Sequence, residues 1–247
     1  MSELLYGKNP ILEALRASRR KAQKFYHLKS GKKDPAIEEV LEICRLRQIN
    51  SIEVGRDWFE AKLSGVLAQG WALECSEFPY LELEALFPKL SEKKQSIVLA
   101  LDQIQDPQNL GAILRNAEAV AVDAVILCTD RAIEVTPAVV KASAGASEHL
   151  AITKVINLAR AMEQLKEKNF WAVGTSLEAK ENGLVFDWPE KLLLVLGSEG
   201  KGMRRLIHEK CDFLIKLPVL GRISSLNVAS TAAVCLYESL RKQRFKA

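Results

Sequence analysis

The stretch that decides the fold is residues 192–203, LLLVLGSEGKGM, in which five apolar residues run directly into a glycine-rich turn. An uninterrupted apolar run of this length is typical of a strand that is buried on both faces of a parallel sheet. The turn holds Gly197, Gly200 and Gly202. Because glycine has no Cβ, a ligand can approach the main chain closely there. The stretch therefore predicts an α/β sheet with a binding loop at the end of a central strand.

A second stretch downstream has the same form. Residues 213–219 (FLIKLPV) predict a strand, residues 220–227 (LGRISSLN) a polar loop, and residues 228–240 a helix. The helix starts with small residues, ASTAA at 229–233, which allow it to pack very closely against a neighbour. Two strand ends with polar, glycine-bearing loops predict a ligand pocket at the carboxyl edge of the sheet.

The rest of the chain alternates between strand-like and helix-like segments. The expected strands cover residues 24–29, 51–54, 71–75, 96–102, 124–128, 152–155 and 170–174. The expected helices cover residues 9–18, 35–47, 57–63, 109–120 and 158–166, with another that starts at the Thr136-Pro137 cap. This alternation predicts a small α/β module at residues 1–78, a linker at 79–95 and a parallel, doubly covered α/β domain at 96–247.

Composition excludes several classes of protein. The five cysteines are spread along the chain without CxxC pairs or His clusters, which favours reduced thiols in a cytoplasmic protein and argues against a metal site. No apolar run approaches about 20 residues, so no membrane span is expected. The start of the chain lacks the pattern of a signal peptide.

Charge is distributed unevenly along the first domain. Residues 1–33 carry nine Lys or Arg against two acids, whereas residues 34–90 carry five against eleven. A cluster of cations at residues 16–33 predicts a basic face that binds phosphates of RNA. The alternative is a face that is simply solvated.

Residues 102–115, DQIQDPQNLGAILR, connect a predicted buried strand to a helix and place polar side chains at the strand end. Asn109 is positioned to cap that helix. Arg115 is the only charged residue between positions 110 and 117. Because its guanidinium cannot lose its proton, it must find an anion or a set of acceptors. The two alternatives are an anionic substrate and a structural ion pair with Asp102 or Asp106.

The two glycine-bearing loops carry further polar candidates. The first lacks both the G-x-G-x-x-G and the G-x-x-x-x-G-K-[ST] pattern, so it predicts neither a dinucleotide site nor a P-loop. Glu199 within it would repel a phosphate, and it suits a hydroxyl, an amine or a cation. The alternative is a solvent-exposed loop acid. In the second loop, Ser225 and Asn227 are candidates for a helix cap or for hydrogen bonds to a polar substrate.

The runs at 102–115, 195–203 and 217–228, taken in this order, resemble the three motifs of the SpoU/TrmH family of RNA ribose 2′-O-methyltransferases, which belongs to the SPOUT class. Residues 5–10 (LYGKNP) and the chain length resemble the subgroup with an L30e-like substrate-binding domain. One departure is Ala68, in the run LAQG, where relatives usually have His before Gln-Gly. It bears on the RNA contacts of the first domain.

The resemblance implies a trefoil-knotted SPOUT methyltransferase domain after a small L30e-like α/β domain, and a homodimer. It implies S-adenosylmethionine as the cofactor, held at Thr175, Gly197, Leu217 and Leu226. Arg115 is then expected to present the ribose, and the expected orienting residues are Asn109, Glu199, Ser225 and Asn227. The implied substrate is a guanosine of 23S ribosomal RNA. The alternatives are a transfer-RNA enzyme of the same family and a non-catalytic RNA-binding or ribosome-assembly protein.

Overall fold

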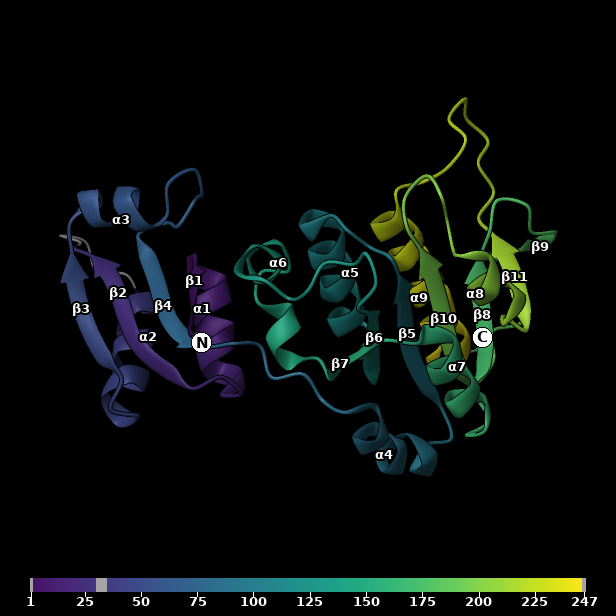
Figure 1. Cartoon of the computed structure of the whole chain (residues 1–247), viewed down its shortest axis with the longest axis horizontal. Helices are drawn as coiled ribbons and strands as arrows, with labels where there is room; N and C mark the ends of the chain where they lie inside the picture. The colour runs from purple at the N-terminus through teal and green to yellow at the C-terminus, as the bar shows by residue number, and fades with distance from the viewer. Residues whose placement is uncertain (1, 30–34, 246–247) are drawn as a thin grey trace. The chain divides into compact units, whose positions relative to one another are not determined.

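The computed structural model describes residues 2–29 and 35–245, and the chain forms two compact units (Figure 1). Unit 1 comprises Met1–Pro79 together with Val135–His149, and unit 2 comprises Tyr80–Glu134 together with Leu150–Ala247. The predicted boundaries at residues 78 and 96 therefore describe the chain only in part, because one segment from the second half of the sequence packs with the first unit.

Unit 1 is built on a sheet with the strand order β1-β4-β2-β3 among the described residues. Its elements are β1 (Ser2–Tyr6), α1 (Lys8–Ala17), β2 (Ala22–Leu28), α2 (Pro35–Leu46), β3 (Asn50–Val54), α3 (Arg56–Lys62), β4 (Trp71–Ser76), α6 (Pro137–Ala142) and the 3-10 turn η2 (Ala146–His149). β4 runs antiparallel to both β1 and β2, whereas β2 and β3 are parallel. Strand β1 was not expected, because its pairing with β4 joins residues about 70 positions apart.

A buried ion pair joins η2 to the rest of unit 1. The Nε of Arg20 donates to Oε2 of Glu148 at 2.9 Å, and the two side chains are 1% and 0% exposed. Glu3 is a second partner of the same guanidinium. Within this segment the predicted helix start is confirmed, since the Thr136 hydroxyl accepts from the Val139 N–H at 3.4 Å.

Four of the basic residues near the N-terminus form ion pairs inside unit 1. Their partners are Glu13 and Glu39 for Arg16, Glu148 and Glu3 for Arg20, Glu74 for Lys24 and Glu53 for Lys29. Arg19 donates to backbone carbonyls of Glu148 and Pro79. The predicted basic face therefore carries acids beside its cations, because residues that are distant in sequence fold back next to them. Its binding to RNA phosphates stays a prediction. Lys32 and Lys33 lie outside the described residues.

Unit 2 is a sheet with the strand order β7-β6-β5-β10-β8-β11-β9 among the described residues. Its strands are β5 (Ser96–Asp102), β6 (Ala124–Cys128), β7 (Ile152–Val155), β8 (Trp171–Thr175), β9 (Glu181–Asn182), β10 (Lys191–Gly197) and β11 (Phe213–Lys216). All neighbouring strands pair in parallel. Residues 192–196 are fully buried between β5 and β8, as the apolar run predicts.

Helices cover both faces of this sheet. They are α4 (Phe87–Glu92), α5 (Pro107–Ala119), α7 (Leu158–Lys166), α8 (Arg205–Glu209) and α9 (Val228–Arg244), with the 3-10 turn η1 (Leu83–Leu86). Residues of η1, α4, α7 and α8 share one apolar cluster with alternate strand residues. The segment at 79–95 that the sequence marks as a linker therefore contributes Leu83, Leu86 and Leu90 to the core of unit 2.

Figure 1 shows α5 and α9 side by side. The Nδ2 of Asn116 on α5 donates to the Ala229 carbonyl of α9 at 3.3 Å. The small residues at the start of α9 permit this close approach. Helix α5 carries most of the first predicted motif, and α9 begins where the third one ends. The packing of α5 on α9 therefore holds these two motifs beside each other.

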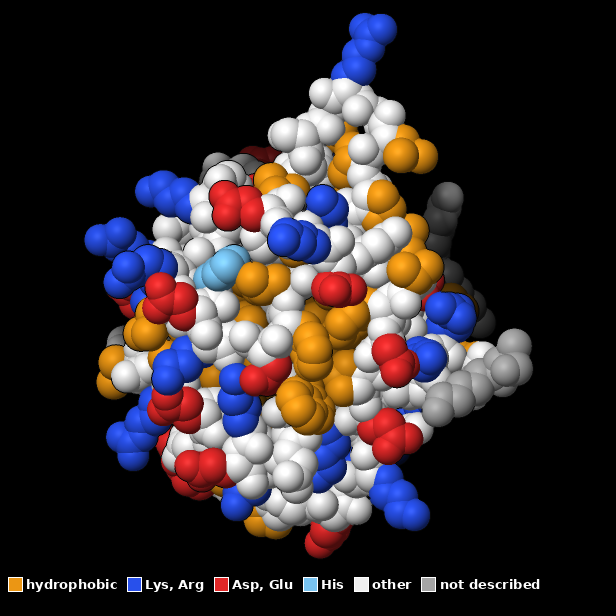
Figure 2. Space-filling view, turned by 90° about the vertical axis from the view of Figure 1, so that its right-hand side faces the viewer, with side chains coloured by type: hydrophobic (Ala, Val, Ile, Leu, Met, Phe, Trp, Pro, Cys, Tyr) orange, Lys and Arg blue, Asp and Glu red, His pale blue; other side chains and the backbone are white. Residues whose placement is uncertain are grey.

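The end of unit 2 seen in Figure 2 carries a group of hydrophobic side chains bordered by charges of both signs. Trp171 and Phe213, on the neighbouring strands β8 and β11, are 51% and 40% exposed, and their ring centroids are 5.7 Å apart. Among the described residues, no helix has both the length and the apolar character needed to cross a membrane.

Candidate active site

The predicted cofactor residues lie at the carboxyl ends of three adjacent parallel strands. Gly197 ends β10, Thr175 ends β8, and Leu217 follows β11 directly. Leu226 is 39% exposed and precedes the first turn of α9 by two residues. The carboxyl edge of a parallel sheet is where open α/β folds bind ligands. The structure thus brings Thr175, Gly197 and Leu217 to one edge.

The glycines of the 197–202 turn serve different purposes. A Cβ on Gly197 would lie 2.1 Å from the Gly202 carbonyl carbon, so the turn's own backbone fills the space that the sequence predicts to be open. The turn closes on itself, since the Ser198 N–H donates to the Gly202 carbonyl at 3.1 Å. At Gly200, where φ is +76°, a Cβ would meet no heavy atom within 4 Å. The turn itself therefore excludes a side chain at Gly197, whereas the space beside Gly200 is open.

A single amide joins the three predicted motifs. The Nδ2 of Asn227 donates to Oδ1 of Asn109 at 2.9 Å and to Oε1 of Glu199 at 2.7 Å. Its Oδ1 accepts from the Ala229 N–H at 2.7 Å and so caps α9. Of the two cap candidates, Asn227 is confirmed. Because both ends of the amide are occupied, its orientation is fixed, and it fixes Glu199 in turn.

Asn109 does not cap α5, and this prediction is wrong. Helix α5 starts two residues earlier, at Pro107, and its cap is Asp106, whose Oδ1 accepts from the Gln108 N–H at 3.1 Å. Proline at the first helical position lacks the N–H that a cap would satisfy. The Asn109 side chain, which is buried, is consequently available to Asn227.

Arg115 is exposed on α5, and within residues 2–29 and 35–245 its guanidinium has no ion pair or hydrogen bond. The alternative of a structural ion pair is wrong. Asp106 caps the helix, and the buried carboxylate of Asp102 binds Arg204, with an Nη2 to Oδ1 distance of 2.7 Å. Ser225 is also outside the Asn227 network. It lies exposed in the loop between β11 and α9, which extends away from the sheet in Figure 1.

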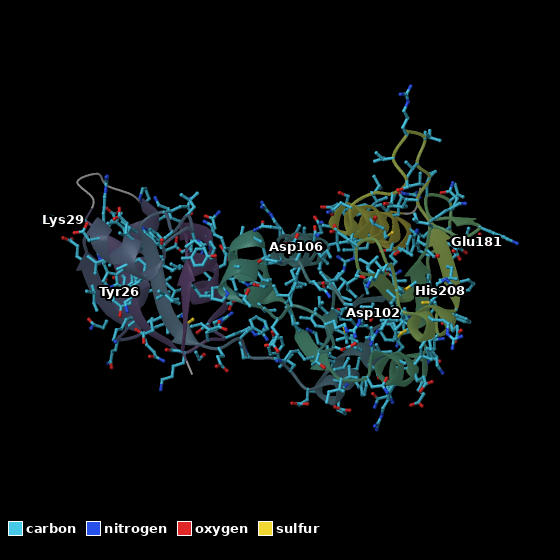
Figure 3. All side chains as sticks on the ribbon, turned by 45° about the horizontal axis from the view of Figure 1, so that its top comes forward. Tyr26, Lys29, Asp102, Asp106, Glu181 and His208 are labelled. Atoms are coloured by element: carbon cyan, nitrogen blue, oxygen red, sulfur yellow. The ribbon has the colours of Figure 1, made fainter. Side chains whose placement is uncertain are left out.

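Arg204 is a residue that sequence analysis missed. Its backbone N–H donates to Oδ2 of Asp102 at 2.8 Å, and its Nη1 lies 3.3 Å from Oδ2 of Asp130. The hydrogen bond to Asp102 raises the pKa of Arg204. Arg204 therefore ties the loop after β10 to the ends of β5 and β6. The sequence signal that could have revealed this contact is Asp102 itself, because a carboxylate at the end of a buried apolar strand requires a partner. Figure 3 labels Asp102 and Asp106.

A cavity of about 370 Å³ opens at the same edge. Its lining comprises Gln103, Ile104, Gln105, Asp106, Asn109, Arg131, Ser198, Glu199, Lys201 and Val228. The set combines two buried aliphatic side chains with amides, carboxylates and two cations. A pocket of this size and composition suits a polar ligand with both hydroxyl and anionic groups.

The thiols are not candidates for chemistry. Burial raises the pKa of Cys75 to about 12 and that of Cys211 to about 12, so both stay protonated at neutral pH. In the part of the chain that the structure describes, no group of three or more His, Cys, Asp or Glu side chains is arranged to hold a metal ion.

Two family models match the chain. The model described as the SpoU rRNA Methylase family matches residues 96–237, and the model described as RNA 2′-O ribose methyltransferase substrate binding matches residues 4–81. The Ala68 position falls within the second match, and Ala68 is buried in an apolar cluster with Tyr6, Phe59 and Ala72.

Individual proteins match over nearly the whole chain. YacO of Bacillus subtilis (strain 168), whose name assigns it to the TrmH family of tRNA/rRNA methyltransferases, is 40% identical, covering 98% of this chain and 96% of YacO. The 23S rRNA (guanosine-2′-O-)-methyltransferase RlmB of Pseudomonas putida (strain KT2440) is 37% identical, covering 99% and 98%. The crystal structure of the SpoU methyltransferase AviRb from Streptomyces viridochromogenes in complex with AdoMet is similar in fold, with a TM-score of 0.82, 22% identity, and coverage of 99% and 92%.

Proposed function

Because the chain belongs to the SpoU rRNA methylase family, we propose that it transfers the methyl group of S-adenosylmethionine to the ribose 2′-hydroxyl of a guanosine in 23S ribosomal RNA. The observation that carries the proposal is the Asn227 amide, which joins Asn109 and Glu199 at the carboxyl edge. Three segments that are far apart in the sequence are thereby held in one hydrogen-bonded group beside a polar cavity.

The donor set at the strand ends fits S-adenosylmethionine. The Thr175 hydroxyl matches a polar atom of the cofactor, and the half-buried Leu217 and the partly exposed Leu226 offer apolar contact. When bound, the cofactor supplies an electrophilic methyl group on a cationic sulfur. We assign Thr175, Gly197, Leu217 and Leu226 to holding it. Gly197 contributes by allowing the 197–202 turn to close on itself.

Arg115 is assigned to the substrate ribose. Its guanidinium is exposed and unpaired within the described residues, so its donors are available to a hydroxyl and a phosphate. It acts by positioning, because an arginine side chain does not accept a proton. The proton of the 2′-hydroxyl goes to the adjacent phosphate or to water. Asn109, Glu199, Ser225 and Asn227 are assigned to orienting the nucleotide and the loops around it.

The proposal includes a trefoil knot, a homodimer and a cytoplasmic location. The knot is supported by the path of the chain after β11. From there the chain passes β8 and β10 and continues as α9, which packs on α5. The dimer is supported by the unpaired Arg115 on α5 and by Tyr237 on α9, which is 52% exposed. Five free thiols support a reducing compartment.

The test compares 2′-O-methylation across all RNAs of cells with and without the protein, together with a titration of S-adenosylmethionine into the purified chain. We expect one guanosine of 23S ribosomal RNA to lose its methyl group. A lost site in transfer RNA instead supports the transfer-RNA alternative. Absence of cofactor binding supports a non-catalytic RNA-binding protein.

A further inference from the structure

Two cations line the cavity at the carboxyl edge without a partner. Arg131 follows β6 and Lys201 follows β10, and β5 lies between these strands. Both side chains are exposed, and within the described residues neither forms an ion pair or a hydrogen bond. They approach the cavity from its two sides, and neither is among the residues assigned above.

The acids beside Arg131 are already occupied. Oδ2 of Asp130 binds Nη1 of Arg204 at 3.3 Å and accepts from Nε2 of Gln103 at 3.0 Å. Asp102 is likewise bound to Arg204. Both carboxylates bind Arg204 and neither pairs with Arg131, so the Arg131 guanidinium can act on whatever enters the cavity.

The backbone here is held in an unfavourable conformation. Arg131 has φ +49° and Gln103 has φ +60°. These values lie in the left-handed region, which residues other than glycine rarely adopt. Both residues line the same cavity. Non-glycine residues held in this region cluster at ligand clamps, where the surrounding structure over-determines them. The Asp130 contacts to Gln103 and Arg204 provide that constraint.

The cavity lining divides by chemistry. Asp106 and Asn109, which follow β5 between the two cations, suit hydroxyls, as does Glu199, which Asn227 holds. Arg131 and Lys201 suit anions, and the buried Ile104 and Val228 provide an apolar floor. A ligand that offers hydroxyls in the middle and an anion on each side matches this arrangement, and a ribose in an RNA strand is flanked by two phosphates.

We infer that Arg131 and Lys201 bind the phosphodiester groups on either side of the target ribose, forming an RNA-backbone subsite. The inference rests on the proposed function, because it takes RNA as the substrate. Backbone contacts of this kind set the register of the strand without reading its sequence. The subsite is separate in role from Arg115, which is assigned to the reacting ribose.

The test uses the full chain with a 23S ribosomal RNA fragment that contains the methylated site. The variants are Arg131→Ala and Lys201→Ala, with Arg160→Ala as the matched control because Arg160 is an exposed cation of α7. For each variant of the subsite we expect the RNA Kd and KM to rise roughly ten-fold and the salt slope of log Kd to fall by about one. The kcat at saturating RNA and the Kd for S-adenosylmethionine stay unchanged, and Arg160→Ala matches the wild type.

Two further variants keep the result interpretable. Arg131→Gly removes the charge and tolerates φ +49°, so it repeats the Arg131→Ala result without added strain. Arg131→Lys keeps the charge, and we expect it to retain the salt slope. Unchanged RNA Kd in the Ala and Gly variants, or loss of the slope in Arg131→Lys, overturns the inference. The RNA-binding measurements do not depend on methyl transfer. A wild-type chain that binds RNA but transfers no methyl group would therefore contradict the proposed function. The Kd values of the variants would still show whether the subsite binds RNA.

Discussion

Arg20 in unit 1 and Arg115 in unit 2 both lie in segments that the sequence marks as RNA-facing, yet their surroundings differ. Arg20 is buried against Glu148 and Glu3, so its charge holds the fold together. Arg115 is exposed and, in the part of the chain that the structure describes, unpaired. The difference teaches that a count of basic residues does not locate an RNA site. In our proposal the RNA site lies where the fold leaves cations without acids.

The largest effect is expected from Glu148→Ala. It leaves the Arg20 guanidinium with one fewer carboxylate in a site that is 1% exposed, and removal of one partner from a buried pair costs about 3–5 kcal/mol. Urea unfolding measures the free-energy change, and the Kd for S-adenosylmethionine of the folded fraction stays at the wild-type value. A loss below about 1 kcal/mol would show that unit 1 does not depend on this pair.

The next largest effect on stability is expected at the ion pair between Asp102 and Arg204, at the carboxyl edge of unit 2. Asp102→Asn removes the charge that faces Arg204, but the Arg204 side chain is 36% exposed, so water compensates part of the loss. We expect a destabilisation of about 1–3 kcal/mol. Unlike Glu148→Ala, this variant also weakens cofactor binding, because the loop after β10 loses its anchor. Calorimetric titration checks the second effect, and equal cofactor affinity in both variants contradicts the distinction.

Much of unit 2 could be predicted from the sequence because its signals are local. The apolar run at 192–196 depends on neighbours along the chain, as does the Thr136-Pro137 helix start in unit 1. The parts that could not be predicted depend on residues distant in sequence. The Arg20 to Glu148 pair spans 128 positions and the Asp102 to Arg204 pair spans 102. Asn227 was identified as a cap candidate, but its link to Asn109 and Glu199 required the fold.

A smaller effect is expected at Asn227, where two substitutions separate structure from function. Asn227→Ala removes the α9 cap and costs about 1 kcal/mol. Asn227→Asp keeps an acceptor for the Ala229 N–H and so retains most of the stability. It cannot donate to Asn109 and it places a carboxylate beside Glu199, so methyl transfer falls in both variants. Wild-type kcat in Asn227→Asp would remove the amide from the mechanism.

The smallest effect is expected in the N-terminal basic segment. Arg16→Ala breaks surface ion pairs with Glu13 and Glu39. Exposed pairs contribute little to stability, and in our proposal the RNA backbone is held at the carboxyl edge of unit 2. Thermal unfolding and RNA Kd are expected to match the wild type. A large rise in RNA Kd would restore the N-terminal segment as the RNA-binding face and break the comparison with the carboxyl edge.

The most direct test of the central claim, that the carboxyl edge of unit 2 presents a ribose hydroxyl to a methyl donor, is a paired measurement on Arg115→Ala. S-adenosylmethionine labelled in its methyl group is incubated with 23S ribosomal RNA, and the product is digested to nucleosides. We predict 2′-O-methylguanosine from the wild type, a loss of at least about 100-fold in kcat for Arg115→Ala, and equal cofactor Kd for both. Undiminished transfer by Arg115→Ala, or label on a base instead of a ribose, would contradict the account.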